Sequence, residues 1–158
     1  MKPSAVGFPG RQGHPRLALD ERLIGESLAL QPLFDRLSRL LGQLAGVALL
    51  ASAGAEPDRQ LCHLAVAKEQ LQSAHEGYAR LARPRHLGDS FHAMGQALAL
   101  LEQIMAQLDR RPAIALLDDA SFCELTQGLS TARRLLLSAS APDLGIVDFV
   151  GACCALSH

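Results

Sequence analysis

Three soft metal ligands lie close together near the end of the printed sequence. Cys153 and Cys154 are adjacent, and His158 follows four residues after Cys154. If this segment is helical, Cys154 and His158 share one face, a spacing that suits a metal ion such as zinc. Zinc usually takes four ligands, so a further group has to come from elsewhere in the chain. A metal- or thiol-dependent site at Cys153, Cys154 and His158 is therefore the alternative hypothesis, and burial of these cysteines as small apolar side chains is the simpler interpretation.

The other titratable residues give no catalytic signature. The Glu-x-x-His spacing of ferritin-like di-metal bundles does not occur around the remaining cysteines and histidines. His86 and His92 meet no obvious base or nucleophile in the sequence. The chain also lacks a Gly-x-Ser-x-Gly nucleophile elbow and a phosphate-binding Gly-x-x-x-x-Gly-Lys loop. The sequence therefore predicts neither a catalytic residue nor an organic cofactor.

Arginine side chains form a third candidate group. If the helices alternate in direction, one end of the molecule gathers Arg80, Arg83, Arg85, Arg133 and Arg134, with Arg36 and Arg39 beside them. Such a cluster could bind an anion or an acidic partner. Asp35 and Asp89 share this end, and the helix dipole favours arginine near helix C-termini in any case. Ordinary solvated helix faces therefore stay open as the alternative.

The elements that must position these groups follow a helical repeat. From Leu17 onward, apolar residues recur at three- and four-residue steps, which indicates one buried face per helix. Pro32 predicts a break or kink near Leu30 to Gln31. Beyond it the repeat continues at Leu33, Leu37, Leu40, Leu44, Val47 and Ala51. Gly54 and Pro57 then predict the end of one helix and the start of the next.

Three further segments carry seven-residue repeats. The repeats are Leu64–Leu71–Tyr78 with Ala67–Ala74–Leu81, Phe91–Leu98–Met105 with Met94–Leu101–Leu108, and Phe122–Leu129–Leu136 with Leu125–Ala132–Ala139. Prolines at 84, 112 and 142 separate or end them. Asp89 or Ser90 is the expected cap of the third helix, and Asp118 or Asp119 that of the fourth. Five glycines inside these helices, Gly42, Gly46, Gly77, Gly95 and Gly128, predict tight helix packing or a local kink, with a close backbone approach or room for a ligand as the alternative.

These patterns predict an all-α fold, an antiparallel up-down four-helix bundle with a kinked first helix, over residues 17–142. Residues 1–16 carry three glycines and three prolines and predict a flexible N-terminal arm. Residues 143–158 form an apolar C-terminal tail, which we expect to dock on the bundle or on a partner.

Composition excludes several classes of protein. The 158 residues are 49% hydrophobic and 20% charged, with a formal net charge of −1, which argues against a disordered chain and against nucleic-acid binding. β-Branched and aromatic residues are too scarce for a β-sandwich. The longest uncharged run, residues 40–55, spans roughly 24 Å as a helix, short of the ~30 Å membrane core.

The first residues do not resemble a secretory signal, so we expect a cytoplasmic protein with reduced thiols. The thirteen arginines against two lysines are typical of GC-rich bacterial genomes.

The sequence therefore predicts a non-enzymatic binding or adaptor protein. Its partner is expected to be another protein or a second copy of this chain, in which case it is a homodimer. The apolar tail and the arginine-rich end are the two candidate contact surfaces. A small-ligand cavity inside the bundle is allowed by the many alanines and glycines, but no residue pattern points to one.

Overall fold

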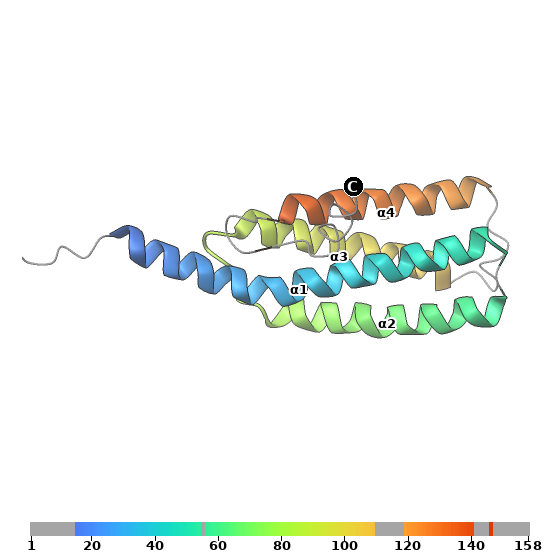
Figure 1. Cartoon of the computed structure of the whole chain (residues 1–158), viewed down its shortest axis with the longest axis horizontal. Helices are drawn as coiled ribbons and strands as arrows, with labels where there is room; N and C mark the ends of the chain where they lie inside the picture. Colours follow the sequence, from blue (N-terminus) through green and yellow to red (C-terminus); the bar gives the residue numbers. More distant parts are fainter. Residues whose placement is uncertain (1–14, 55, 110–118, 141–145, 147–158) are drawn as a thin grey trace, which may run out of the picture.

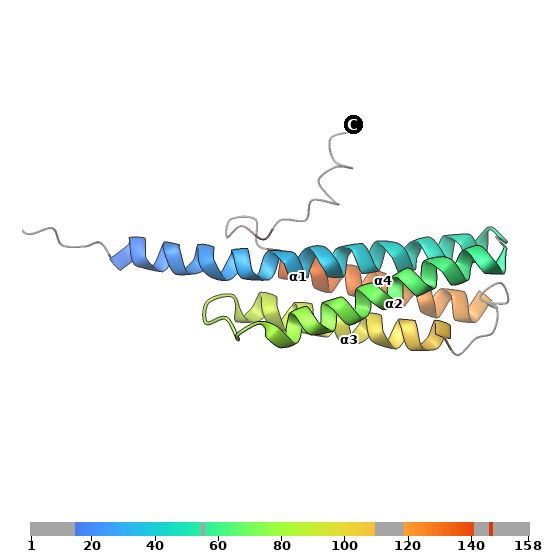
Figure 2. The ribbon, with the colours of Figure 1, turned by 90° about the horizontal axis from the view of Figure 1, so that it is seen from below.

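The computed structural model describes residues 15–54, 56–109, 119–140 and 146. These ranges contain four helices, α1 (Pro15–Ser52), α2 (Pro57–Arg80), α3 (Gly88–Asp109) and α4 (Asp119–Ala139), and no strand. Successive helices run in opposite directions and lie side by side (Figures 1 and 2). The all-α four-helix bundle predicted from the sequence is therefore confirmed.

The core of the bundle follows the predicted repeats. On α1, Leu37, Leu40, Leu44 and Val47 are fully buried, and this helix packs against each of the other three. The repeat positions of α3 are all buried. On α2 and α4 the alanines and leucines of the repeats are buried or half-buried against the same cluster. Local periodicity was therefore enough to identify the face that each helix buries.

The first helix is not interrupted at Pro32. α1 continues through this proline, so the predicted break near Leu30 to Gln31 is wrong, whereas the kink stays a prediction. Proline inside a helix costs about 3 kcal/mol, because it removes one backbone hydrogen bond and crowds the preceding turn. Leu30, Leu33 and Phe34, which flank it, are at most 2% exposed. Burial of each such side chain contributes about 1.5–3 kcal/mol, which outweighs the cost of the proline.

One of the predicted helix ends is confirmed by the structure, and another differs from it. Gly54 has a φ of +68° and Pro57 is the first residue of α2, as predicted for this turn. The third helix, in contrast, begins at Gly88, and its first backbone bond runs from the Phe91 N–H to the Leu87 carbonyl. The predicted caps Asp89 and Ser90 thus lie inside the first turn. α4 begins at Asp119, and Asp118 lies outside the described residues.

Three of the five helical glycines mark close packing between helices. A Cβ placed on Gly95 would lie 2.5 Å from the Tyr78 hydroxyl, and one on Gly128 would lie 3.1 Å from the Ile104 side chain. A Cβ placed on Gly77 would lie 2.7 Å from Nη1 of the Arg36 guanidinium. Among the described residues, none lies within 4 Å of a Cβ placed on Gly42 or Gly46. The packing interpretation therefore holds for Gly77, Gly95 and Gly128 and is wrong for Gly42 and Gly46.

The bundle has an overhang at one end. The loop between α2 and α3 contacts α1 at Glu26, and the part of α1 that precedes this contact projects beyond the other helices (Figures 1 and 2). We call Pro15–Gly25 the α1 extension. The predicted arm covers residues 1–16, of which 1–14 lie outside the described residues and 15–16 are helical. Of the predicted tail, Ile146 is described, and it is fully buried in the core cluster.

Candidate functional site

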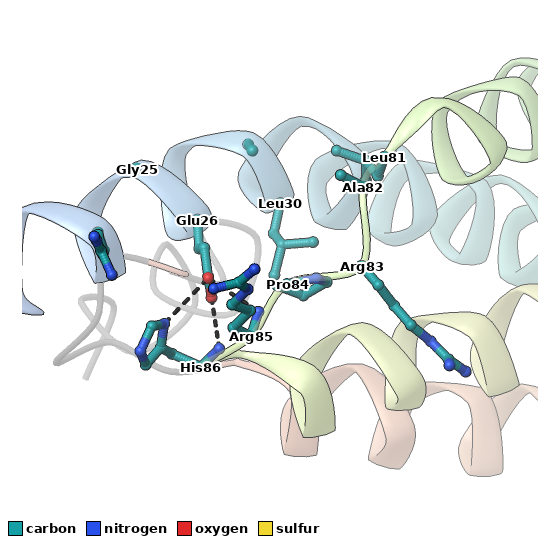
Figure 3. A pocket seen from close by; sticks show the side chains of 11 residues that line it. Gly25, Glu26, Leu30, Leu81, Ala82, Arg83, Pro84, Arg85 and His86 are labelled. Atoms are coloured by element: carbon teal, nitrogen blue, oxygen red, sulfur yellow. Dashed lines mark hydrogen bonds and ion pairs between the residues drawn. The ribbon is translucent and has the colours of Figure 1, made fainter.

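A groove lies where the α2–α3 loop meets α1. It has a volume of about 500 Å³, and Figure 3 shows it from close by. We call it the α1–loop groove. Its lining residues are Arg22, Gly25, Glu26, Ala29 and Leu30 from α1, and Leu81, Ala82, Arg83, Pro84, Arg85 and His86 from the end of α2 and the loop. Two of the arginines predicted from the sequence, Arg83 and Arg85, thus line a concave surface.

The Glu26 carboxylate holds the loop in place. Its oxygens accept hydrogen bonds from the backbone N–H groups of Arg85 (3.0 Å), His86 (2.9 Å) and Leu87 (3.1 Å). The Nδ1 atom of His86 lies 3.2 Å from the same carboxylate, and its ring is turned toward Glu26 (Figure 3). These N–H groups directly precede α3, so Glu26 anchors the segment that leads into this helix, whereas a capping side chain would accept from N–H groups inside its first turn.

The hydrogen bonds determine the charge state of Glu26. Burial of this side chain, which is 20% exposed, would by itself raise its pKa. The N–H donors of His86, Arg85 and Leu87, together with the His86 side chain, outweigh burial and lower the pKa from 4.5 to about 2. A carboxylate with so low a pKa is a poor proton acceptor at neutral pH. Glu26 is therefore poorly suited to accept a proton in this groove.

The guanidinium groups of the groove have no carboxylate of their own. Within the described part of the chain, Arg22, Arg83 and Arg85 form no ion pair, and the only acid among the lining residues is Glu26. Arg83 points away from Glu26, whereas Arg85 lies beside it (Figure 3). Arg22 lies one helical turn before Glu26, about 6 Å closer to the start of α1. The three arginine side chains therefore do not converge on one point of the groove (Figure 3).

The remaining predicted arginines lie elsewhere. Arg80 forms an exposed ion pair with Glu76 at 3.2 Å. Arg133 and Arg134 are exposed on α4, where Arg134 donates to the Thr131 hydroxyl at 3.1 Å. Arg134 also lines a separate polar hollow of about 340 Å³ with Thr126, Gln127, Ser130 and Thr131. Neither Arg133 nor Arg134 lines the α1–loop groove.

Arg36 lies farther along the bundle than expected. Because α1 is continuous, Arg36 is in the middle of this helix rather than at its start, and it donates to the Ser73 carbonyl on α2 at 3.3 Å. The same continuity brings Arg22 and Glu26 to the loop. Both residues were missed from the sequence, because the expected break at Pro32 placed the end of the bundle too far along the chain.

Two histidines have carboxylate partners that the sequence did not indicate. His86 contacts Glu26, as described, and His75 lies 3.4 Å from Glu102. The expectation that His86 meets no base is therefore wrong. Glu26 and His86 are sixty positions apart, so no local spacing could reveal the pair. His92 lies 3.1 Å from Gln96 in the next turn of α3.

The predicted metal ligands Cys153, Cys154 and His158 lie outside the described residues, and this site stays a prediction. Over the ranges that are described, no three His, Cys, Asp or Glu side chains are grouped so that they could hold a metal ion. The described helices also include none with the length and hydropathy needed to cross a membrane.

Comparison with known proteins identifies no relative of this chain. No protein family, curated protein or solved structure matches this chain. The functional argument therefore depends on the groove and on the surfaces around it.

Proposed function

We propose that this chain is a binding or adaptor protein that takes an acidic segment of a partner protein in the α1–loop groove. The observation that carries the proposal is the presence of three arginines, Arg22, Arg83 and Arg85, among the residues that line the groove, none of them with a carboxylate partner in the described ranges. Unpaired guanidinium groups attract carboxylates and give both charge and hydrogen-bonding specificity.

The shape and lining of the groove favour an extended segment over a compact anion. The arginines do not converge on one point, and Ala29, Leu30, Leu81 and Pro84 add apolar residues to the same lining. A peptide with alternating acidic and apolar side chains would match both features. Glu26 does not cancel the attraction, because its carboxylate oxygens are bound by the loop N–H groups.

A short fluorescent peptide of alternating glutamate and leucine tests the proposal by fluorescence anisotropy. We expect binding that weakens as salt is raised, because the groove charges are solvent-accessible. The double variant Arg83→Glu with Arg85→Glu should lower the affinity at least tenfold, a loss of about 1.4 kcal/mol in binding free energy. Arg59→Glu is the matched control, since Arg59 is an exposed arginine in the first turn of α2, at the other end of the bundle.

Two outcomes of that experiment would contradict the proposal. One is equal binding of a peptide with glutamine in place of glutamate, which would show that charge is not recognised. The other is an equal loss of affinity in the Arg59→Glu control, which would show a general effect of net charge rather than recognition by the groove.

Self-association is a second proposal for the same class of function. Leu49 is 67% exposed near the end of α1, and Leu61 is 56% exposed near the start of α2. The last turn of α1 and the first turn of α2 lie at the end of the bundle opposite the loop between α2 and α3 (Figure 1). Large apolar side chains exposed at one end of a molecule favour contact between copies. Sedimentation of the chain and of its Leu49→Glu, Leu61→Glu variant distinguishes a homodimer from a monomer.

A cytoplasmic location belongs to this proposal as well. Cys62 and Cys123 are free and exposed. Exposed free thiols persist in a reducing compartment, whereas oxidising compartments convert them to disulfides or oxidised forms.

A further inference from the structure

The side of α1 that faces away from the α1–loop groove carries one acidic and two apolar side chains. Ile24 is 56% exposed and Leu28 is 69% exposed, and Glu21 is exposed on the same side of the helix. At 100° per residue, all three lie about 160–220° around α1 from Glu26, which lines the groove. We call Glu21, Ile24 and Leu28 the outer stripe. The outer stripe and the groove are therefore on opposite sides of α1.

The outer stripe is accessible to a second molecule. Glu21 and Ile24 belong to the α1 extension, Pro15–Gly25, which projects beyond the other helices (Figure 2). Within the described part of the chain, Glu21 forms no ion pair. An isolated helix as short as the extension is marginal in water, because its few backbone hydrogen bonds barely offset the ordering of its residues. A contact along the outer stripe would therefore stabilise the extension.

The α1–loop groove has the complementary chemistry. Its three arginines have no carboxylate partner in the described ranges, and Leu30 and Leu81 add apolar residues to its lining. Helices that bind in grooves commonly do so through side chains at positions i, i+3 and i+7 of one face. Glu21, Ile24 and Leu28 have this spacing. The outer stripe therefore offers the groove a carboxylate and two apolar side chains on one helix face.

The outer stripe and the groove also match in length. Leu28 lies seven positions after Glu21, which is about 10 Å along the helix. The wall of the groove that α1 provides runs from Arg22 to Leu30, which is about 12 Å. A second helix that lies along this wall can therefore bring all three side chains of the stripe to the groove.

We propose that the outer stripe of one molecule binds in the α1–loop groove of a second copy of this chain. The inference rests on the proposed function, because it names the acidic segment that the groove takes. Since the stripe and the groove lie on opposite sides of α1, each molecule offers its stripe to one neighbour and its groove to another. The contact is therefore heterologous and joins molecules head to tail, and it differs from a contact through Leu49 and Leu61.

Complementation between two variants tests this contact. Arg83→Glu with Arg85→Glu alters the groove and leaves the stripe intact, whereas Ile24→Ser with Leu28→Ser alters the stripe and leaves the groove intact. In sedimentation velocity, we expect the native chain to associate as its concentration rises. Each variant alone should associate at least about tenfold more weakly. An equimolar mixture of the two should recover the native affinity but stop at a one-to-one complex, because it contains one intact contact.

Three outcomes of that experiment would overturn the proposal. The first is a native chain that stays monomeric at its highest soluble concentration. The second is a mixture that associates no more tightly than either variant alone. The third is a stripe variant that associates as tightly as the native chain, which would place the contact elsewhere, as at Leu49 and Leu61.

Reversal of one charge provides a second measurement that leaves the apolar side chains unchanged. Glu21→Arg should weaken association of the chain about fivefold or more, because it places a positive charge against the arginines of the groove. Glu124→Arg is the matched control, since Glu124 is exposed on α4 and the change in net charge is the same. An equal loss in the two variants would show a general effect of net charge and would overturn the proposal.

The peptide of alternating glutamate and leucine separates this inference from the proposed function. Where both hold, the peptide binds the groove and competitively inhibits association of the chain. A peptide that binds the groove of a chain that does not associate through its stripe would overturn this inference alone, since the groove would then take an acidic partner other than a second copy. Absence of both peptide binding and association would overturn both.

Discussion

Glu26 joins two parts of the molecule that are distant in sequence. Its carboxylate accepts three backbone N–H groups from the segment that leads into α3, and it faces the His86 ring. Hydrogen bonds to a charged acceptor contribute about 1.5–3 kcal/mol each when isolated from water, and less where water competes. One side chain therefore determines the position of the loop that forms half of the groove.

Replacement of Glu26 by alanine should destabilise the fold by about 2 kcal/mol, because three N–H groups lose their acceptor. Glu26→Gln keeps one acceptor oxygen without the charge and should cost about 1 kcal/mol. Urea denaturation measures both values. Glu76→Ala is the control, since its exposed ion pair with Arg80 is worth less than about 1 kcal/mol. A loss for Glu26→Ala no larger than the control would contradict the role given to this carboxylate.

The low pKa of Glu26 predicts how stability depends on acid. The folded-state pKa is about 2, below the ordinary value of 4.5, so the stabilising contribution is complete above about pH 4.5. It is lost as pH falls from there toward 2, because the unfolded chain takes up the proton first. Over this window the free energy of unfolding should fall by about 1–2 kcal/mol more in the native protein than in Glu26→Gln. Parallel pH profiles for the two proteins would contradict this prediction.

At the scale of the helices, the sequence was a good guide wherever the signal was local. The repeats of α2, α3 and α4 identified the buried faces, because a helix places residues seven apart on one side. The break predicted at Pro32 was wrong, because the free energy that this proline costs the helix is smaller than the free energy gained by burying Leu30, Leu33 and Phe34. That gain depends on contacts with the other helices, which the local sequence does not show. The groove depends on a contact between Glu26 and residues about sixty positions later, and no periodicity encodes such a contact.

Helix packing at glycine predicts opposite effects for two similar substitutions. Gly95→Ala should lower stability by about 1–3 kcal/mol, because its Cβ would overlap the Tyr78 ring. That ring is stacked on Phe91 with centroids 4.5 Å apart, so it has little freedom to move. Gly42→Ala meets open space and should raise stability by up to about 1 kcal/mol through helix propensity. Thermal denaturation of the two variants compares them, and effects of equal sign would contradict the packing described.

At the scale of the whole molecule, α1 is the helix that organises the bundle. It packs against each of the others, and its second half, which includes Leu37, Leu40 and Leu44, is fully buried on the core side. Its first residues project beyond the bundle (Figure 2). One continuous helix therefore runs from a region of dense packing into a region with few neighbours.

Amide hydrogen exchange should reveal this gradient. We expect amides between residues 37 and 47 to exchange only through global unfolding, because opening them disrupts the core. Amides between residues 19 and 22 should exchange at least a hundredfold faster, since fraying there exposes little buried surface. The end of α2 at Arg80 provides a comparison for a helix end that lies within the bundle. Uniform protection along α1 would contradict this picture.

The contact between Tyr78 and Gly95 also restricts the order in which this sequence can change during evolution. A side chain at position 95 has no room while the aromatic ring lies over it. Loss of the ring at position 78 leaves a gap that a methyl group at position 95 could later fill. Descendants of this chain should therefore exchange the tyrosine first and the glycine second, and the two positions should vary together among its relatives.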